Sequence, residues 1–175
     1  QRGGTDSGAA GGNWKRVRTG GEVTLNNVTN TVAIVAADLT GASSLSYTDA
    51  DGLSIGMIAQ AGTGNAQLAA ETGIVATGAD ETVTVTSLTG QLTVDDVITT
   101  TSGNVEPMAT AGALLIDAAV TTTAGTATLT AGTTITSTAA GTITTTRRNA
   151  ADPCPAGVPV LPPPTGYGAI HQSGR

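Results

Sequence analysis

The segment TVTVTSLTGQLTVDDVITTTSG at positions 82–103 is followed directly by NVEPMATAGALLIDAAVTTTAG at positions 104–125. When the second segment is placed under the first, identical or similar residues match at a constant offset of 22 positions. The matched pairs are Gly90 with Gly112, Leu92 with Leu114, Val94 with Ile116, Asp95 with Asp117, Ile98 with Val120 and Gly103 with Gly125. A shorter copy follows at 126–141, and TITTT at 142–146 begins another. The chain therefore contains a repeat of about 22 residues.

Each copy alternates apolar residues with Thr and other small polar residues, and glycines interrupt the alternation. A period of two with many β-branched residues predicts strands. A repeat of this length fits one coil of a parallel β-helix, in which short strands wrap around an axis and stack on the next coil. We therefore expect an all-β fold, a parallel β-helix (β-solenoid), with Val94 and Ile116 both pointing inward, one above the other. An antiparallel β-sandwich of short strands is the alternative, and the constant offset favours the solenoid.

The composition limits what the core can contain. The 175 residues include no Phe, one Trp and two Tyr, and only 11% of them are charged. The core must therefore consist of Val, Ile, Leu, Ala and Thr rather than aromatic rings. The sequence has no apolar run of about 20 residues, so we expect no transmembrane helix and no insertion into a membrane.

The charges divide the chain into three zones. All seven basic residues lie near the ends, at Arg2, Lys15, Arg16, Arg18, Arg147, Arg148 and Arg175. Of the thirteen acids only Asp6 and Asp152 lie outside positions 19–146, which leaves eleven within them and no base. We predict a Gly-rich basic arm at 1–21, a solenoid body at 22–146 and a Pro-rich tail at 147–175, both ends being irregular. An acidic body argues against nucleic acid as a partner, because phosphate contacts need clustered Lys and Arg.

The single cysteine and the single histidine both lie in the tail. Cys154 cannot form an intramolecular disulfide, so it either pairs between chains or stays an idle thiol. His171 alone excludes a metal site built from several imidazoles. The chain begins with Gln1 rather than Met, which predicts a processed product or an excised fragment of a longer protein.

The segments 28–41 and 46–56 resemble the β-strand repeats of large bacterial surface proteins, the filamentous-haemagglutinin-like adhesins and autotransporter passenger domains. The later copies with their recurring V-T-T-T ending resemble the same arrays. The resemblance covers roughly residues 22–146 and rests on repeat style rather than on a catalytic motif. It implies a secreted, right-handed parallel β-helix displayed on a Gram-negative cell surface.

Two acidic groups are candidate sites. The sequence Asp49-Ala50-Asp51-Gly52 is similar to the start of a calcium loop, but the further ligands of such a loop are missing from the sequence that follows, which favours a turn. Asp95 and Asp117 are equivalent repeat positions and Asp96 is adjacent, so they would stack as in polysaccharide-cleaving β-helices, or form a solvated turn or a weak metal site. We predict no catalytic, cofactor-binding or metal-binding residue and no cofactor.

Alternating Thr residues form rows that would lie on one face of a strand. The rows are Thr82/Thr84/Thr86, Thr126/Thr128/Thr130, Thr134/Thr136/Thr138 and Thr142/Thr144/Thr146. Stacked coils would turn such rows into a flat surface of hydroxyl and methyl groups, as on ice-binding solenoids, although Glu106, Pro107 and Met108 break the row in one copy. An exposed face of good strand formers is the plainer explanation.

We therefore expect a non-enzymatic, extracellular structural or adhesive β-repeat protein that is surface-displayed or forms a fibre by subunit association. An ice-binding solenoid is the alternative, and a carbohydrate-active β-helix is a weaker one. The expected partners are other copies of the chain and a host-cell or surface glycan. We expect the basic ends to lie along an acidic neighbouring body, and open strand edges to supply most of the affinity.

Overall fold

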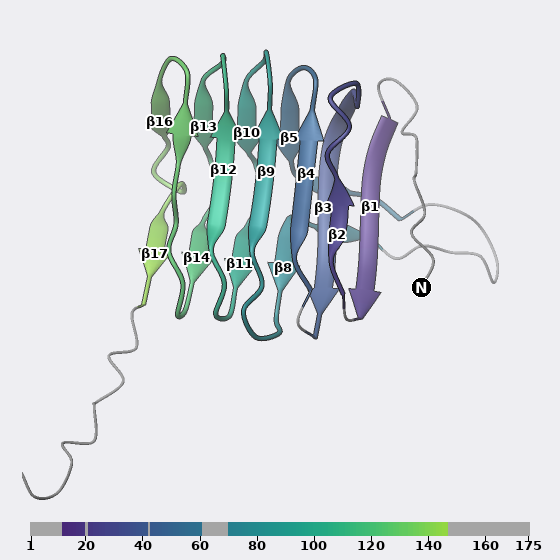
Figure 1. Cartoon of the computed structure of the whole chain (residues 1–175). Coiled ribbons are helices and arrows are strands. Elements are labelled where there is room, and N and C mark those ends of the chain that lie inside the picture. Colours follow the sequence, from purple (N-terminus) through teal and green to yellow (C-terminus); the bar gives the residue numbers. More distant parts are fainter. Residues whose placement is uncertain (1–11, 20, 42, 61–69, 147–175) are drawn as a thin grey trace, which may run out of the picture.

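The structure, a computed structural model, describes residues 12–19, 21–41, 43–60 and 70–146. For residues 12–19 it describes the backbone only. The described residues form a row of stacked parallel strands (Figure 1). The strands are β1 (Gly12–Thr19), β2 (Val23–Leu25), β3 (Val32–Thr40), β4 (Leu45–Asp49), β5 (Leu53–Ile55), β6 (Met57–Ile58), β7 (Glu71–Thr72), β8 (Ile74–Ala76), β9 (Val83–Ser87), β10 (Leu92–Val94), β11 (Ile98–Thr100), β12 (Val105–Ala109), β13 (Leu114–Ile116), β14 (Val120–Thr122), β15 (Thr130–Ala131), β16 (Ile135–Ser137) and β17 (Ile143–Thr145).

Successive strands wrap around a common axis as five coils. Coil 1 contains β2 and β3, coil 2 contains β4, β5 and β8, and coils 3, 4 and 5 contain β9–β11, β12–β14 and β15–β17. Three faces result. Face A is the five-stranded sheet β2-β4-β9-β12-β15, face B is β5-β10-β13-β16 and face C is β8-β11-β14-β17. Strand β3 is long enough to pair with both β5 and β8, so it joins faces B and C.

The predicted register is confirmed. Val94 pairs with Ile116 in the parallel ladder β10–β13, and neither side chain is exposed to solvent. The same offset of 22 residues relates Ile98 to Val120 on face C. All these ladders are parallel, so the β-sandwich alternative is wrong.

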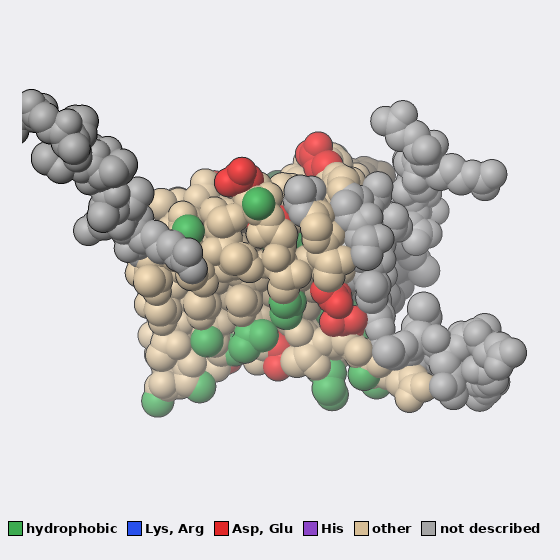
Figure 2. All heavy atoms as spheres, turned by 90° about the horizontal axis from the view of Figure 1, so that it is seen from below, with side chains coloured by type: hydrophobic (Ala, Val, Ile, Leu, Met, Phe, Trp, Pro, Cys, Tyr) green, Lys and Arg blue, Asp and Glu red, His purple; other side chains and the backbone are tan. Residues whose placement is uncertain are grey.

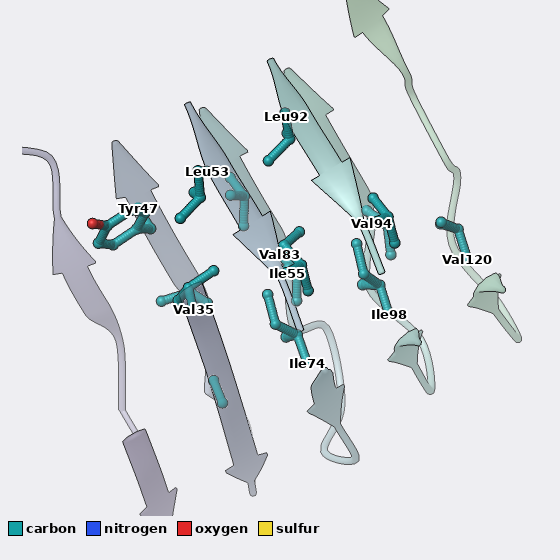
Figure 3. Packing of buried hydrophobic residues seen from close by; sticks show 14 of the residues in the cluster. Val35, Tyr47, Leu53, Ile55, Ile74, Val83, Leu92, Val94, Ile98 and Val120 are labelled. Carbon is teal, nitrogen blue, oxygen red and sulfur yellow. The ribbon is translucent and has the colours of Figure 1, made fainter. Parts of the chain in front are cut away.

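The inward side chains form continuous apolar rows along the axis. Leu53 and Leu92 follow one another on face B, and Ile98 and Val120 follow one another on face C (Figure 3). Leu114 continues the row of face B in the next coil. Burial alternates along each strand, because successive side chains of a strand point to opposite sides of the sheet. Short β-branched and Leu side chains suit this narrow interior, which explains a core with a single buried tyrosine in the described residues.

One insertion interrupts the repeat. Leu45 pairs with Val83, an offset of 38 residues, because coil 2 carries an additional segment between β5 and β8. The described ends of this segment, β6 and β7, pair with each other in antiparallel fashion. The chain re-enters face C through Gly73. Its φ of +67° is unfavourable for residues with a side chain, and a Cβ here would collide with the Val97 backbone.

The amino-terminal zone differs from the expected irregular arm. Part of it is strand β1, which pairs in parallel with the whole length of β3 from Gly12↔Val32 to Thr19↔Thr40. The glycines and bases of this segment gave no apolar period, but backbone pairing to a neighbouring edge needs none. The Pro-rich tail, with Arg147, Arg148, Cys154 and His171, lies outside the described residues.

Face A weakens at its last step. Strand β15 has two residues, and earlier in coil 5 the pairing with β12 is reduced to the isolated bridge Val105↔Ala127. Pro107 lies between these two contacts, in the middle of β12. Because proline has no N–H to donate to the following coil, the ladder is interrupted there.

Candidate functional site

The last coil is the most unusual surface of the described chain. Ile135 and Ile143 occupy the same inward rows as Leu114 and Val120, with which they pair. Leu114 and Val120 are fully buried, whereas Ile135 and Ile143 are 50% and 51% exposed. No described strand covers coil 5. Among the described residues, the apolar interior is therefore open at this end on faces B and C.

Backbone groups also point out of this end. The N–H of Leu114 donates to the carbonyl of Thr134, and the N–H of Thr138 donates to the carbonyl of Ile116. The backbone N–H and C=O groups of residues 134 and 138 thus point back to coil 4. Because these groups alternate in direction along a parallel strand, those of Ile135 and Ser137 point to the open side. The bonds Val120 N–H to Thr142 and Thr146 N–H to Thr122 set the same alternation on β17.

On β17 the backbone N–H and C=O groups of Ile143 and Thr145 therefore also point to the open side. Coil 5 therefore offers two short rows of N–H and C=O groups beside two exposed isoleucines. An edge of this kind is a template for another strand.

Strand β1 forms the opposite end of faces B and C. It lies beyond β3, at the other extremity of the row from β16 and β17 (Figure 1). One edge of β1 pairs with β3, and its other edge is unpaired among the described strands. The stack therefore has two free edges whose strands run in the same direction, since every ladder between them is parallel.

Face C carries two columns of threonines, of which the rows read from the sequence included only the member in the last coil, Thr144. Thr99, Thr121 and Thr144 are in register on β11, β14 and β17, at outward-facing positions. The second column contains Thr101 and Thr123, which lie two residues after Thr99 and Thr121 on the same two coils. The recurring triplet T-T-T was visible in the repeat, but only the coil geometry shows that its first and third members share one face.

The middle threonine of each triplet has a different role. Thr100 and Thr122 are buried, and both hydroxyls donate to the carbonyl of Gly103 at 2.8 Å. These hydroxyls satisfy the buried carbonyl at a corner of the coil and do not contribute to the surface.

On face A the predicted interruption is present. Thr84 pairs with Glu106 and Thr86 pairs with Met108, so the outward threonine rows stop at β12. The Thr84 hydroxyl donates to Glu106 Oε2 at 3.2 Å. Face C, not face A, is thus the regular threonine surface.

The acidic residues Asp95 and Asp117 lie at equivalent corners on successive coils, as the repeat predicts. The N–H of Asp117 donates to the carbonyl of Val94, and the Ser54 hydroxyl donates to Asp95. Asp117 Oδ1 is buried and has no hydrogen-bond partner in the described residues. In the described residues Asp95 and Asp117 do not belong to a cluster of three or more acidic, histidine or cysteine side chains. The carbohydrate-active alternative stays a prediction that no cluster of side chains supports.

Asp49 belongs to the interior rather than to a loop. Its Oδ2 accepts hydrogen bonds from the Tyr47 hydroxyl at 2.8 Å and from the Val32 N–H at 2.9 Å. Its Oδ1 accepts the N–H of Asp51 at 3.2 Å, which closes a turn. Burial raises the pKa of Asp49 and also that of Tyr47. These donors occupy both oxygens of Asp49, while Asp51 is exposed.

Glu81 is a buried acid at the corner that leads into β9. It is equivalent to Gly103, and a Cβ at Gly103 would overlap the Glu81 carbonyl. Both carboxyl oxygens of Glu81 are buried without a hydrogen-bond partner in the described part of the chain. Burial raises the pKa of Glu81, and the neighbouring Asp80 raises it further. The sequence alone did not distinguish this acid from the exposed ones.

A recess of about 440 Å³ lies on face A near coils 1 to 3. Its lining consists mainly of hydroxyl groups with one carboxylate, from Glu22, Ser44, Leu45, Ser46, Thr82 and Thr84. Elsewhere the described surface seen in Figure 2 is largely uncharged, with acidic side chains in separate groups.

Within the described ranges, no three His, Cys, Asp or Glu residues are placed to hold a metal ion. The same residues include no helix that is long and apolar enough to cross a membrane. Comparisons of the chain with protein-family models, curated proteins and solved structures find no match.

Proposed function

We propose that this protein is a non-enzymatic, extracellular β-repeat protein that serves as a structural or adhesive element and lengthens by association of subunits. The observation that carries the proposal is the open end of coil 5. A monomeric soluble protein ordinarily covers its apolar interior, whereas Ile135 and Ile143 leave the interior accessible. The resemblance of residues 22–146 to surface β-strand repeats agrees with an exported location.

The cellular location provides the test of this function. Antibodies raised against residues 22–146 should label intact producing cells and detect the protein in the medium, with a cytosolic enzyme as the control for lysis. Labelling that requires permeabilised cells would overturn the extracellular role. A surface glycan as the adhesive partner stays a prediction, for which the hydroxyl-lined recess beside Glu22 is the candidate position.

A second candidate function is ice binding, and the threonine columns of face C favour it. The columns place hydroxyl and methyl groups about 4.8 Å apart between coils and about 6.6 Å apart along each strand. The outward positions Thr99, Thr121 and Thr144 carry no charge and are held by ladders on a rigid stack. Such a grid can hold water molecules in a regular array.

Thermal hysteresis measurements separate the two candidates. If face C binds ice, the wild-type chain produces hysteresis and Thr121→Lys abolishes it. Thr86→Lys on face A is the matched control, because Thr86 is also half-buried at an outward strand position. Absence of hysteresis in the wild-type chain eliminates this candidate.

A further inference from the structure

We infer that coil 5 of one molecule is the docking surface for strand β1 of a second copy, so that copies join head to tail with parallel strands. This inference rests on the proposed function and names its partner surface. Strands β16 and β17 would pair with β1 of the next copy as β5 and β8 pair with β3 within one molecule.

Strand direction favours this arrangement over the others. β1 runs parallel to β3, and each later strand of faces B and C runs parallel to its neighbour. Translating a copy along the axis therefore brings β1 beside coil 5 in the same parallel sense that the rest of the stack uses. A contact between two β1 strands, or between two copies of coil 5, related by a two-fold axis would be antiparallel.

The lengths of the two edges also agree. β1 spans Gly12–Thr19 and covers β3 across both faces, from Val32 to Thr40. Coil 5 presents β16 and β17 on the same two faces. One continuous strand of the next copy can thus cover both short edges and the two exposed isoleucines between them.

The distribution of charge disfavours the symmetric contact at the amino-terminal end. β1 contains Lys15, Arg16 and Arg18, whereas residues 124–146 contain no charged residue. A contact between two β1 strands would bring three bases from each copy together. A contact between β1 and coil 5 instead pairs a basic strand with a segment of zero net charge, which differs from the expectation that the basic ends meet an acidic body.

The chain's own tail is a poor occupant of this edge. Residues 147–175 contain six of the seven prolines, at Pro153, Pro155, Pro159, Pro162, Pro163 and Pro164. Proline donates no backbone hydrogen bond, so this stretch offers few consecutive donors for a ladder. A heterologous contact between different surfaces does not close on itself when the operation is a translation, and it therefore produces a filament.

The test blocks the edge without altering the internal ladder. Ser137 and Thr145 turn their N–H groups to the open side, so the double variant Ser137→Pro/Thr145→Pro removes two edge donors. Ser137→Ala/Thr145→Ala is the matched control, because it changes the same side chains and keeps both N–H groups. Circular dichroism establishes that each variant is folded, and sedimentation velocity with negative-stain electron microscopy measures assembly.

We expect filaments from the wild-type chain and from the alanine control, and at least a tenfold higher concentration for assembly of the proline variant. Because its β1 is intact, the proline variant should also cap growing ends. A small fraction mixed with wild-type chain should shorten the filaments. A proline variant that assembles like wild type, or that fails to shorten the filaments, would overturn the docking of β1 on coil 5.

The full chain and a chain ending at Thr146 are compared to test the tail as occupant. Equal or stronger assembly of the shorter chain supports docking by a second copy. A full chain that stays monomeric at its highest soluble concentration and low salt overturns the inference, and so does assembly that appears only after the tail is removed. These outcomes leave the extracellular location, tested by antibody labelling, unaffected.

Discussion

Coils 4 and 5 have similar inward patterns on faces B and C, yet the burial of their apolar side chains on these faces differs. Leu114 in coil 4 and Ile135 in coil 5 are neighbours in one ladder, and the first is fully buried while the second is half exposed. Their local strands are equally short and regular. What differs is that coil 4 has a following coil, whereas coil 5 has none among the described residues.

The inward side chains of a coil are therefore buried by the coils stacked on both sides of it. In a stack each repeat contacts only its neighbours, so stability is the sum of each repeat's own contribution and of the contacts between adjacent repeats. A terminal repeat therefore lacks half of its interface. Four predictions, each with a variant and its control, test how burial and the contacts between coils determine stability.

The largest effect is expected for Ile116→Asp. The carboxylate would replace a fully buried side chain between Val94 and Ser137, with no partner for its charge. Burial of an unpaired charge costs several kcal/mol, roughly 4 kcal/mol or more, so we expect loss of the folded state. Chemical denaturation followed by circular dichroism measures it.

Ser137→Asp is the control for that substitution. Ser137 follows Ile116 in the same row but is exposed in coil 5. Its free energy of unfolding should change by less than about 0.5 kcal/mol. Equal effects of the two substitutions would show that burial does not separate the coils.

The second prediction uses truncation to alanine. Leu114→Ala should lower the free energy of unfolding by about 2–5 kcal/mol because it leaves a cavity in a closed interior. Ile135→Ala removes a half-exposed side chain and should cost about 1 kcal/mol. Denaturation of the monomer, below the concentration for assembly, gives both values, and a larger cost at Ile135 would contradict the open end.

The third prediction concerns the closest approach between coils. Gly103→Ala should destabilise the chain by about 1–3 kcal/mol, because the new Cβ meets the rigid carbonyl of Glu81 in the preceding coil. Gly56→Ala is the control, since its Cβ would first meet a side-chain atom of Ile34 at 3.4 Å. Thermal melts of both variants test the difference, which disappears if the coils can separate freely at this corner.

The smallest effect is expected for Glu81→Gln. Because burial raises the pKa of Glu81 in the folded chain, the protonated acid is favoured there. The stability that it contributes is complete below the unfolded pKa of about 4.3 and declines as the pH rises toward the folded pKa. At pH 7 the glutamine variant should be about 1 kcal/mol more stable, with no difference near pH 4.

The measurement is the free energy of unfolding from pH 4 to pH 8 for both chains. Glu106→Gln is the control, because Glu106 is half-buried and receives the Thr84 hydroxyl. A stability difference between Glu81→Gln and wild type that does not change with pH would contradict a buried, proton-binding Glu81.

The sequence by itself predicted the repeating part of the fold. The offset of 22 between Val94 and Ile116, with alternation around it, requires strands whose apolar side chains fall on one side, and stacking is the arrangement that buries every copy. It did not predict the insertion between β5 and β8, because those residues have no counterpart in the other coils. It also missed β1, because a strand held by backbone pairing needs no apolar pattern.

The candidate sites depended on the tertiary structure to a greater degree. The triplets at 99–101 and 121–123 were present in the sequence, but the coil geometry decided that their outer members share face C while Thr100 and Thr122 turn inward. Whether an acid is buried, as Glu81 is, depends on the neighbouring coil and not on adjacent residues. Apolar periodicity is local, so the residues alone were enough to predict that the copies stack. Whether a coil is covered depends on its neighbours in space, and among the described residues coil 5 has none on its outer side, which leaves Ile135 and Ile143 half exposed.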